Sequence, residues 1–299
     1  MSELTTISAQ LADAVQAAGA WTVRVQARRG PAASGIVLGA DLILTADHVV
    51  DPSREENIRV GLPDGSEVGA SVVGRDPATD VAVLKIASGT LTPAAAAAAE
   101  PRTGSLALVV GRPGSQPSAS LGLITGSGGP TRTRRGGMLE RFIMVDAVMY
   151  PGFSGGALVD TDGQVIGMIT SGLGFGGPAV ALPWSLVSQV AETLKTHGKV
   201  ARGYLGIGSQ PVSLSQQAKD LGGGQERGLL VIQVAEGGPA ATGGVLQGDI
   251  LVRVGGSSIA NADDLQGILT PAKVGTAVSL SVVRGGELKE LSVTVGSRD

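Results

Sequence analysis

The sequence predicts a mainly β protein, built as barrels or sandwiches, and three observations lead to this. Short apolar segments follow one another from about residue 21 to residue 182, with turn residues between them and no helical periodicity. The chain has 47 glycines, which suit many tight turns, and only 2% aromatic residues. Its 299 residues fit about two domains at roughly 100–200 residues each.

The chain begins with a predicted helical segment over residues 1–20. Within residues 2–18, Leu4, Ile7, Leu11 and Val15 recur at helical spacing, and Ser2 is a suitable N-cap. Residues 21–27 then alternate between apolar and polar side chains, which is typical of a half-buried strand.

The next part of the chain predicts a succession of short strands. Their expected ranges are Ile36–Leu38, Leu42–Thr45, Ile58–Leu62, Val68–Val73, Val81–Ile86, Leu106–Val110, Leu121–Gly126, Phe142–Val148, Ala157–Val159 and Val165–Thr170. Residues 63–65 and 162–163 are expected hairpin turns. The alanines at 94–99 favour helix in isolation, but between two prolines they are expected to form a connector that joins two barrels. Residues 184–197 predict a helix that stops at Gly198.

A second β-rich unit begins near Gly203. The predicted boundaries are 21–200 for the first domain and 201–299 for the second. Asn261 is a suitable cap for a helix over residues 263–269. The expected strands of this unit are Leu229–Val234, Ile250–Val254, Val278–Arg284 and Leu288–Val295.

Composition excludes several classes of function. The net charge of −3 and the absence of a basic segment argue against a nucleic-acid partner. With no cysteine and only two histidines, a metal site or other cofactor is not expected. The sequence contains no stretch of 18 apolar residues, so no membrane span is predicted. The first lysine or arginine is Arg24, which does not fit a secretory signal, so the sequence predicts a cytoplasmic protein unless an upstream segment was removed.

Three residues are candidates for nucleophilic catalysis. Ser154 lies in a glycine-rich segment that allows a sharp turn and a close approach to substrate. His48 follows an apolar strand and could serve as its base. Asp80 opens another apolar strand, where a buried carboxylate needs a partner such as a histidine N–H. Taken singly, each residue also fits an ordinary turn or packing role.

Together these segments resemble the HtrA branch of the trypsin-like serine proteases. Five motifs carry the resemblance: Thr45-Ala46-Asp47-His48-Val49-Val50, Asp76-Pro77-Ala78-Thr79-Asp80-Val81-Ala82-Val83-Leu84-Lys85, Gly111-Arg112-Pro113-Gly114, Pro151-Gly152-Phe153-Ser154-Gly155-Gly156 and Pro178-Ala179-Val180-Ala181-Leu182-Pro183. It implies a two-barrel protease domain. The resemblance assigns Ser154 as nucleophile, His48 as general base and acid, and Asp80 as the residue that holds the imidazole. The N–H groups of Gly152 and Ser154 become the expected oxyanion hole.

The same resemblance implies a substrate pocket for small or medium aliphatic side chains. Met149 is expected on one wall, with core packing as the alternative, and Val180, Ala181 and Leu182 on the other, in a strand that pairs with the substrate backbone. Phe153 departs from the family pattern, in which a small polar residue is usual before the serine.

Residues from about 203 resemble a PDZ domain, which binds an extended peptide C-terminus at a sheet edge. The residues implied in peptide binding are Tyr204, Leu205, Gly206, Ile207, Leu265, Ile268 and Leu269. Helix residues among them could equally face the core.

The sequence therefore predicts an ATP-independent serine endopeptidase that acts on unfolded or exposed polypeptides in protein quality control, with peptide C-termini as partners of the second domain. A homotrimer is an option, although the first 20 residues contain no aromatic side chain. Two alternatives stay open: a weakly active or inactive peptide-sensing or chaperone factor, and an esterase that uses the same serine.

Overall fold

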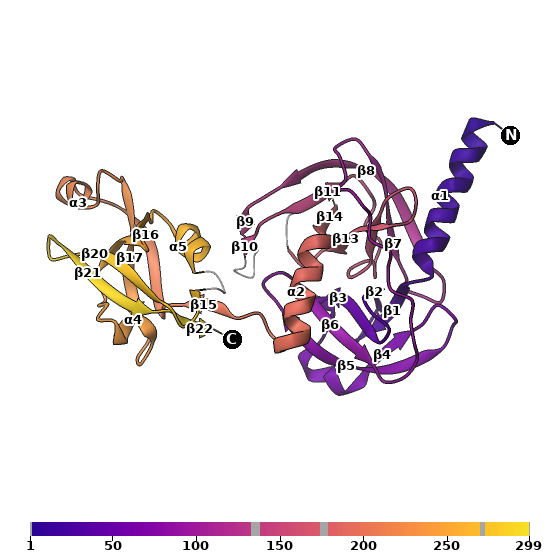
Figure 1. Cartoon of the computed structure of the whole chain (residues 1–299), viewed down its shortest axis with the longest axis horizontal. Coiled ribbons are helices and arrows are strands. Elements are labelled where there is room, and N and C mark those ends of the chain that lie inside the picture. The colour runs from indigo at the N-terminus through magenta and orange to yellow at the C-terminus, as the bar shows by residue number, and fades with distance from the viewer. Residues whose placement is uncertain (1, 133–137, 174–178, 270–272, 299) are drawn as a thin grey trace. The chain divides into compact units, whose positions relative to one another are not determined.

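A computed structural model of the chain describes residues 2–132, 138–173, 179–269 and 273–298. The chain divides into two compact units, residues 1–199 and 200–299 (Figure 1). Both are built mainly from strands, so the predicted fold class is confirmed.

The first half of unit 1 is a closed antiparallel barrel in the order β1-β2-β3-β6-β5-β4. Every residue of β2 and all but one of β6 are buried, because these strands face the barrel core on one side and neighbouring elements on the other. The strand ranges are β1 Thr22–Gln26, β2 Ala33–Val37, β3 Leu42–Ala46, β4 Ile58–Gly61, β5 Glu67–Asp76 and β6 Val81–Ile86. Short 3-10 turns, η1 Asp47–Val49 and η2 Pro52–Asn57, connect β3 to β4.

The second half is another closed barrel, in the order β11-β14-β13-β12-β7-β8. Its strands are β7 Leu106–Gly111, β8 Ser118–Gly128, β11 Phe142–Val145, β12 Ala157–Val159, β13 Val165–Thr170 and β14 Ala179–Pro183, with a two-stranded pair, β9 Thr131–Arg132 and β10 Met138–Leu139, beside them. β11 is shorter than predicted, because a register shift at Met144 and Val145 ends the ladder and residues 146–150 form a loop.

The alanine-rich segment connects the two barrels and forms no helix, as expected. Ala96 forms an isolated bridge with Val165, and Ala97 N donates a 3.0 Å hydrogen bond to Val165 O. The flanking prolines and this pairing outweigh the helix preference of alanine.

Two helices pack on unit 1. α1 (Glu3–Gly19) begins at Ser2, whose hydroxyl accepts from Thr5 N at 3.3 Å. Its buried residues lie in the last turns, whereas Leu4 is 78% exposed, so only the end of the predicted apolar stripe packs on the barrel (Figure 1). α2 (Trp184–His197) has the predicted boundaries and ends at Gly198 in the left-handed conformation.

Unit 2 is a sheet in the order β16-β17-β18-β20-β21 with short helices, in which β16 is an edge strand. The ranges are β15 Arg202–Tyr204, β16 Ile207–Ser213, β17 Arg227–Val234, β18 Ile250–Val254, β19 Ser257–Ser258, β20 Ala277–Arg284, β21 Glu287–Thr294, β22 Gly296–Arg298, α3 Gln216–Leu221, α4 Pro239–Thr242 and α5 Ala262–Ile268. β15 pairs with β22, and Asn261 caps α5 as predicted. Within the described residues, no helix has the length and apolar character needed to cross a membrane.

Candidate active site

The register of the first barrel brings His48 to Asp80. The ladder between β3 and β6 pairs Ala46 with Val81, so the residues just beyond each pair lie side by side. Asp47 N donates to Asp80 O at 3.1 Å, and His48 then begins a tight 3-10 turn at the barrel rim. Two residues that are 32 positions apart therefore meet because of strand pairing.

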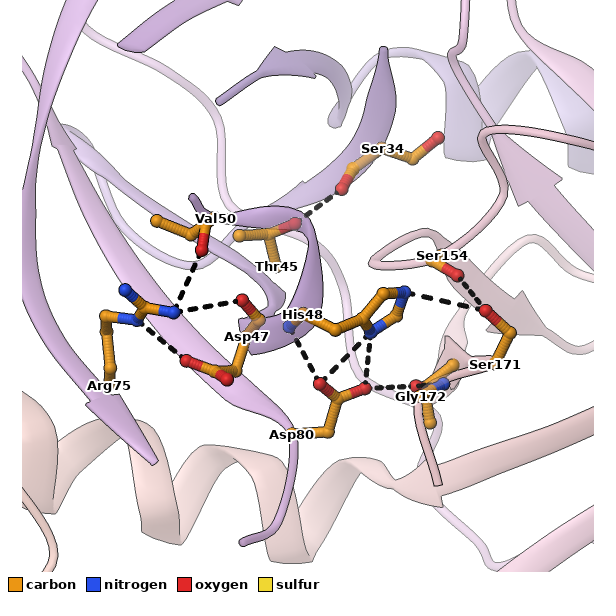
Figure 2. Close-up of polar contacts among 11 residues, drawn as sticks. Ser34, Thr45, Asp47, His48, Val50, Arg75, Asp80, Ser154, Ser171 and Gly172 are labelled. Atoms are coloured by element: carbon orange, nitrogen blue, oxygen red, sulfur yellow. Dashed lines mark hydrogen bonds and ion pairs between the residues drawn. The ribbon is translucent and has the colours of Figure 1, made fainter. Parts of the chain in front are cut away.

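Asp80 is completely buried and points its carboxylate at the imidazole (Figure 2). Asp80 Oδ2 lies 2.8 Å from His48 Nδ1, and Asp80 Oδ1 accepts from the His48 backbone N–H at 2.9 Å. Its φ of +59° is in the left-handed region, which aspartate tolerates better than most side chains. This conformation turns both the carbonyl and the carboxylate of Asp80 toward residues 47 and 48.

A half-buried arginine holds the turn that carries His48. Arg75 on β5 donates to Asp47 Oδ1 at 2.7 Å, to Glu55 Oε1 at 2.9 Å and to the Val50 carbonyl at 2.9 Å. Burial alone would lower the pKa of Arg75, but the bonds to Asp47 and Glu55 outweigh it and raise the pKa. Arg75 therefore stays charged and fixes the turn on both sides of the histidine.

Ser154 lies in the loop before β12, and the side chain of the preceding residue, Phe153, anchors this loop. Phe153 is fully buried in the core of the second barrel, with Tyr150 edge-on at 5.4 Å between ring centroids. Gly155 has a φ of +82°, and a Cβ there would lie 2.2 Å from the Ser34 carbonyl oxygen. Phe153, which departs from the family pattern, thus anchors the loop in an apolar core. Glycine is required at position 155 because the loop passes close to the backbone of β2 there.

Ser34 on β2 fixes the carbonyl groups of this loop. The Ser34 hydroxyl donates to Gly152 O at 2.7 Å and accepts from Arg112 N at 2.8 Å, and Ser34 N donates to Ser154 O at 3.1 Å. Within the described residues, the N–H groups of Gly152 and Ser154 have no hydrogen-bond acceptor. Both donors are available to an oxyanion, and the oxyanion hole at these residues stays a prediction.

The end of β13 supplies two further hydroxyl groups. Thr170 Oγ1 donates a short hydrogen bond to Asp80 Oδ2 and accepts from Gly172 N at 2.9 Å. Ser171 Oγ lies 2.9 Å from Ser154 Oγ and 3.5 Å from His48 Nε2, so it stands between the two (Figure 2). No direct hydrogen bond joins Ser154 to His48 among the described residues. The structure thus joins His48 to Asp80 by hydrogen bonds, and it connects Ser154 to His48 only through the Ser171 hydroxyl.

The residues expected in the substrate pocket lie in or against the core. Met149 is half-buried and packs against the core of the second barrel. Val180, Ala181 and Leu182 on β14 are buried, and both Val180 and Ala181 pair with β11 on one side and β13 on the other. At Val180 and Ala181 both edges of β14 are thus occupied by neighbouring strands, and Ala181 belongs to the core of the second barrel. A role of these residues in the substrate pocket stays a prediction.

In unit 2, the expected peptide-binding residues gather around the connection from β15 to β16 and the helix α5. Tyr204 ends β15, and Gly206 has a φ of +81°. The five apolar members belong to one core cluster; Leu205, Leu265 and Leu269 are buried in it, while Ile207 and Ile268 are half-buried. The N–H groups of Leu205 and Gly206 have no acceptor in the part of the chain that the structure describes.

Sequence reasoning missed Ser34, Thr170 and Ser171. Each lies at or next to the end of an apolar strand, where hydroxyl residues are common, so no local pattern distinguishes them. Only the pairing of strands shows that they contact the loop or the His48–Asp80 pair.

Removal of the Thr170 hydroxyl should weaken catalysis. In Thr170→Val the buried Asp80 carboxylate loses a donor, and hydrogen bonds to charged groups are worth about 1.5–3 kcal/mol. We expect kcat/KM for a peptide substrate to fall by about 10- to 100-fold. Thr170→Ser keeps the hydroxyl and is the matched control. Equal kcat/KM in wild type and Thr170→Val would contradict the assigned contact.

Comparisons with known proteins agree with this architecture. Residues 33–168 match the family described as trypsin-like peptidase domain, and residues 203–295 match the PDZ domain family. A relative from Pseudomonas fulva (strain 12-X), named "Probable periplasmic serine endoprotease DegP-like", is 37% identical over 271 residues, covering 88% of this chain and 55% of the relative. The chain thus spans about half the length of that relative.

Solved structures extend the match over nearly the whole chain. The serine endoprotease from Yersinia pestis is 29% identical with a TM-score of 0.77, and covers 97% of this chain and 98% of its own. The structure titled "HtrA-type protease AlgW with tripeptide" is 31% identical with a TM-score of 0.74, over 97% of both chains. The chain belongs to the HtrA-type family of trypsin-like serine proteases with one PDZ domain.

One prediction from the sequence is overturned by these relatives. The absence of a visible secretory signal predicts a cytoplasmic protein, but the relatives with 36–37% identity are named periplasmic. The cytoplasmic assignment is therefore wrong, because a leader pattern at one end says less about location than similarity along 88% of the chain.

Proposed function

We propose that this chain is an ATP-independent serine endopeptidase that cleaves unfolded or exposed polypeptides outside the cytoplasm. The observation that carries the proposal is the buried Asp80 carboxylate on His48 Nδ1, beside a serine loop with two unengaged N–H donors. Endoprotease activity and a periplasmic location are the named properties of the DegP-like relatives.

The residues support the following sequence of steps. Ser154 Oγ attacks the peptide carbonyl carbon while His48 Nε2 accepts its proton, and the N–H groups of Gly152 and Ser154 stabilise the oxyanion. His48 returns the proton to the leaving amine, and water then hydrolyses the acyl-enzyme by the same route. Asp80 holds the imidazole with Nδ1–H toward the carboxylate and stabilises the imidazolium. Water is the only co-reactant, so no step requires ATP.

The substrate class follows from access to the loop. A peptide bond must reach Ser154, which is only 8% exposed, so the polypeptide has to enter as an extended segment. Folded proteins seldom present such segments, whereas unfolded ones do, and this supports a role in protein quality control.

A second candidate, a weakly active peptide-sensing factor, is favoured by one observation. Ser154 and His48 are bridged by Ser171 rather than bonded directly. An esterase receives no comparable support.

Labelling and product analysis together test the proposal. A fluorophosphonate should label the protein at Ser154, located by fragmentation mass spectrometry, and casein should be cut at internal peptide bonds, shown by sequencing the products. A protein that labels but hydrolyses only p-nitrophenyl esters would be an esterase. A protein that binds peptides without labelling would be a sensing factor.

The PDZ domain should depend on a free peptide carboxylate. We propose that the Leu205 and Gly206 N–H groups donate hydrogen bonds to this carboxylate. A peptide would pair with the edge strand β16, with its last side chain against Ile207 and Ile268. Amidation of the C-terminus of an apolar-ending peptide should weaken binding by about 10- to 100-fold, since charge-assisted bonds are lost. Fluorescence anisotropy measures both affinities, and equal values would contradict the site.

A further inference from the structure

The Ser171 hydroxyl lies between the Ser154 hydroxyl and the His48 imidazole. Ser154 Oγ is 2.9 Å from Ser171 Oγ, whereas Ser171 Oγ is 3.5 Å from His48 Nε2 (Figure 2). A base acts on a proton from about 2.6–3.2 Å. The shorter bond therefore ties the nucleophile to a second hydroxyl rather than to its base.

The backbone on either side of Ser171 is held in place. Thr170 is bonded to Asp80, and Gly172 N donates to Thr170 Oγ1 at 2.9 Å. A Cβ at Gly172 would lie 2.5 Å from both His48 Nδ1 and Asp80 Oδ2, so this segment lies directly against the pair. These contacts hold the backbone of Ser171 in place, while the residue itself is exposed.

We propose that Ser171 is a positioning residue that holds the Ser154 hydroxyl away from His48 while no substrate is bound. An entering polypeptide releases Ser154 by competing for the exposed Ser171 hydroxyl, after which the Ser154 side chain rotates to His48 Nε2. This inference rests on the proposed endopeptidase function. It explains why a well-bonded His48–Asp80 pair coexists with a nucleophile that is bonded elsewhere.

Labelling kinetics of the unliganded protein provide the test. The second-order rate of fluorophosphonate labelling at Ser154 should rise about 2- to 10-fold in Ser171→Ala, the effect of losing one neutral hydrogen bond. Ser171→Thr keeps a hydroxyl at this position, so its labelling rate should stay near the wild-type value. Thr193→Ala is the matched control, because it removes a hydroxyl that donates to Gln189 O within α2.

Peptide kinetics give a second readout that a purely structural role would not produce. Since bound substrate removes the Ser171 contact in both proteins, kcat should be equal and the gain of Ser171→Ala should fall on kcat/KM. Labelling of Ser171→Ala at or below the wild-type rate overturns the proposal, and a slower rate would mean that Ser171 relays the proton. An equal rise in Ser171→Thr would also overturn it, because the hydroxyl would then not be the cause.

The two proposals fail in different ways. If Ser154 is labelled in the wild type but Ser171→Ala is not faster, only the role of Ser171 is lost. If the label is found on Ser171, or on no serine of any variant, the proposed endopeptidase mechanism itself is wrong.

Discussion

Ser154→Ala should abolish both fluorophosphonate labelling and casein cleavage, with a loss of about 10⁶-fold in turnover. The hydroxyl oxygen is the atom that bonds to the acyl group in the acyl-enzyme. The residual rate of the variant then depends only on the oxyanion donors and on substrate binding. Turnover is measured with a quenched fluorescent peptide, and cleavage of casein is followed by gel electrophoresis.

The variant should remain folded, which makes the result interpretable. Its lost hydroxyl is bonded only to the exposed Ser171, while Phe153 and the Ser34 contacts that anchor the loop are unchanged, within the part of the chain that the structure describes. The thermal midpoint should therefore stay close to that of wild type. Undiminished casein cleavage by Ser154→Ala would disprove the assignment of the nucleophile.

Asp80→Asn should lower kcat by about 10⁴-fold. An asparagine can present its amide N–H to His48 Nδ1, which now meets a carboxylate, and this favours the tautomer with the proton on Nε2. Its neutral side chain also does not stabilise the imidazolium. It also replaces the charged acceptor of the Thr170 hydroxyl. The measurement is kcat on the same quenched peptide, at a pH where wild type is fully active.

Asp47→Asn is a suitable comparison for Asp80→Asn. Asp47 is also buried and lies next to His48, but its side chain pairs with Arg75. Its replacement should act mainly on the position of the turn and on stability, and so lower kcat much less. Similar losses in the two variants would indicate that both act by disturbing the turn, contrary to the role assigned to Asp80.

Local pattern predicted several elements to the residue. β6, β12, β13 and β18 have the expected boundaries, because apolar runs flanked by turn residues pair along their whole length. α2 was equally well defined by its periodicity and by Gly198. The stripe on α1 was misleading, since Leu4 and Ile7 are exposed and the small residues Ala14 and Ala18 make the close approach to the barrel.

Within the candidate site, the sequence identified the residues with distinctive chemistry. His48 and Ser154 stand out because histidine is scarce in this chain and glycines surround the serine. It could not identify Thr170, because a threonine at a strand end is unremarkable until β13 is placed beside Asp80. It could not show that Val180 and Ala181 pair with a strand on each side, because an apolar strand looks the same whether its edges are free or paired.

The sequence by itself determined many of the strands, the helix α2 and the residues able to do the chemistry, since these depend on side-chain type and on spacing along a few residues. Only the tertiary structure decided which groups touch. The register between β3 and β6 joins His48 to Asp80, and the contact of β13 with β3 of the first barrel brings Ser171 between His48 and Ser154. Such contacts join residues 17 to 123 positions apart, and they are set by strand pairing and by the packing of one barrel on the other, which no local pattern records.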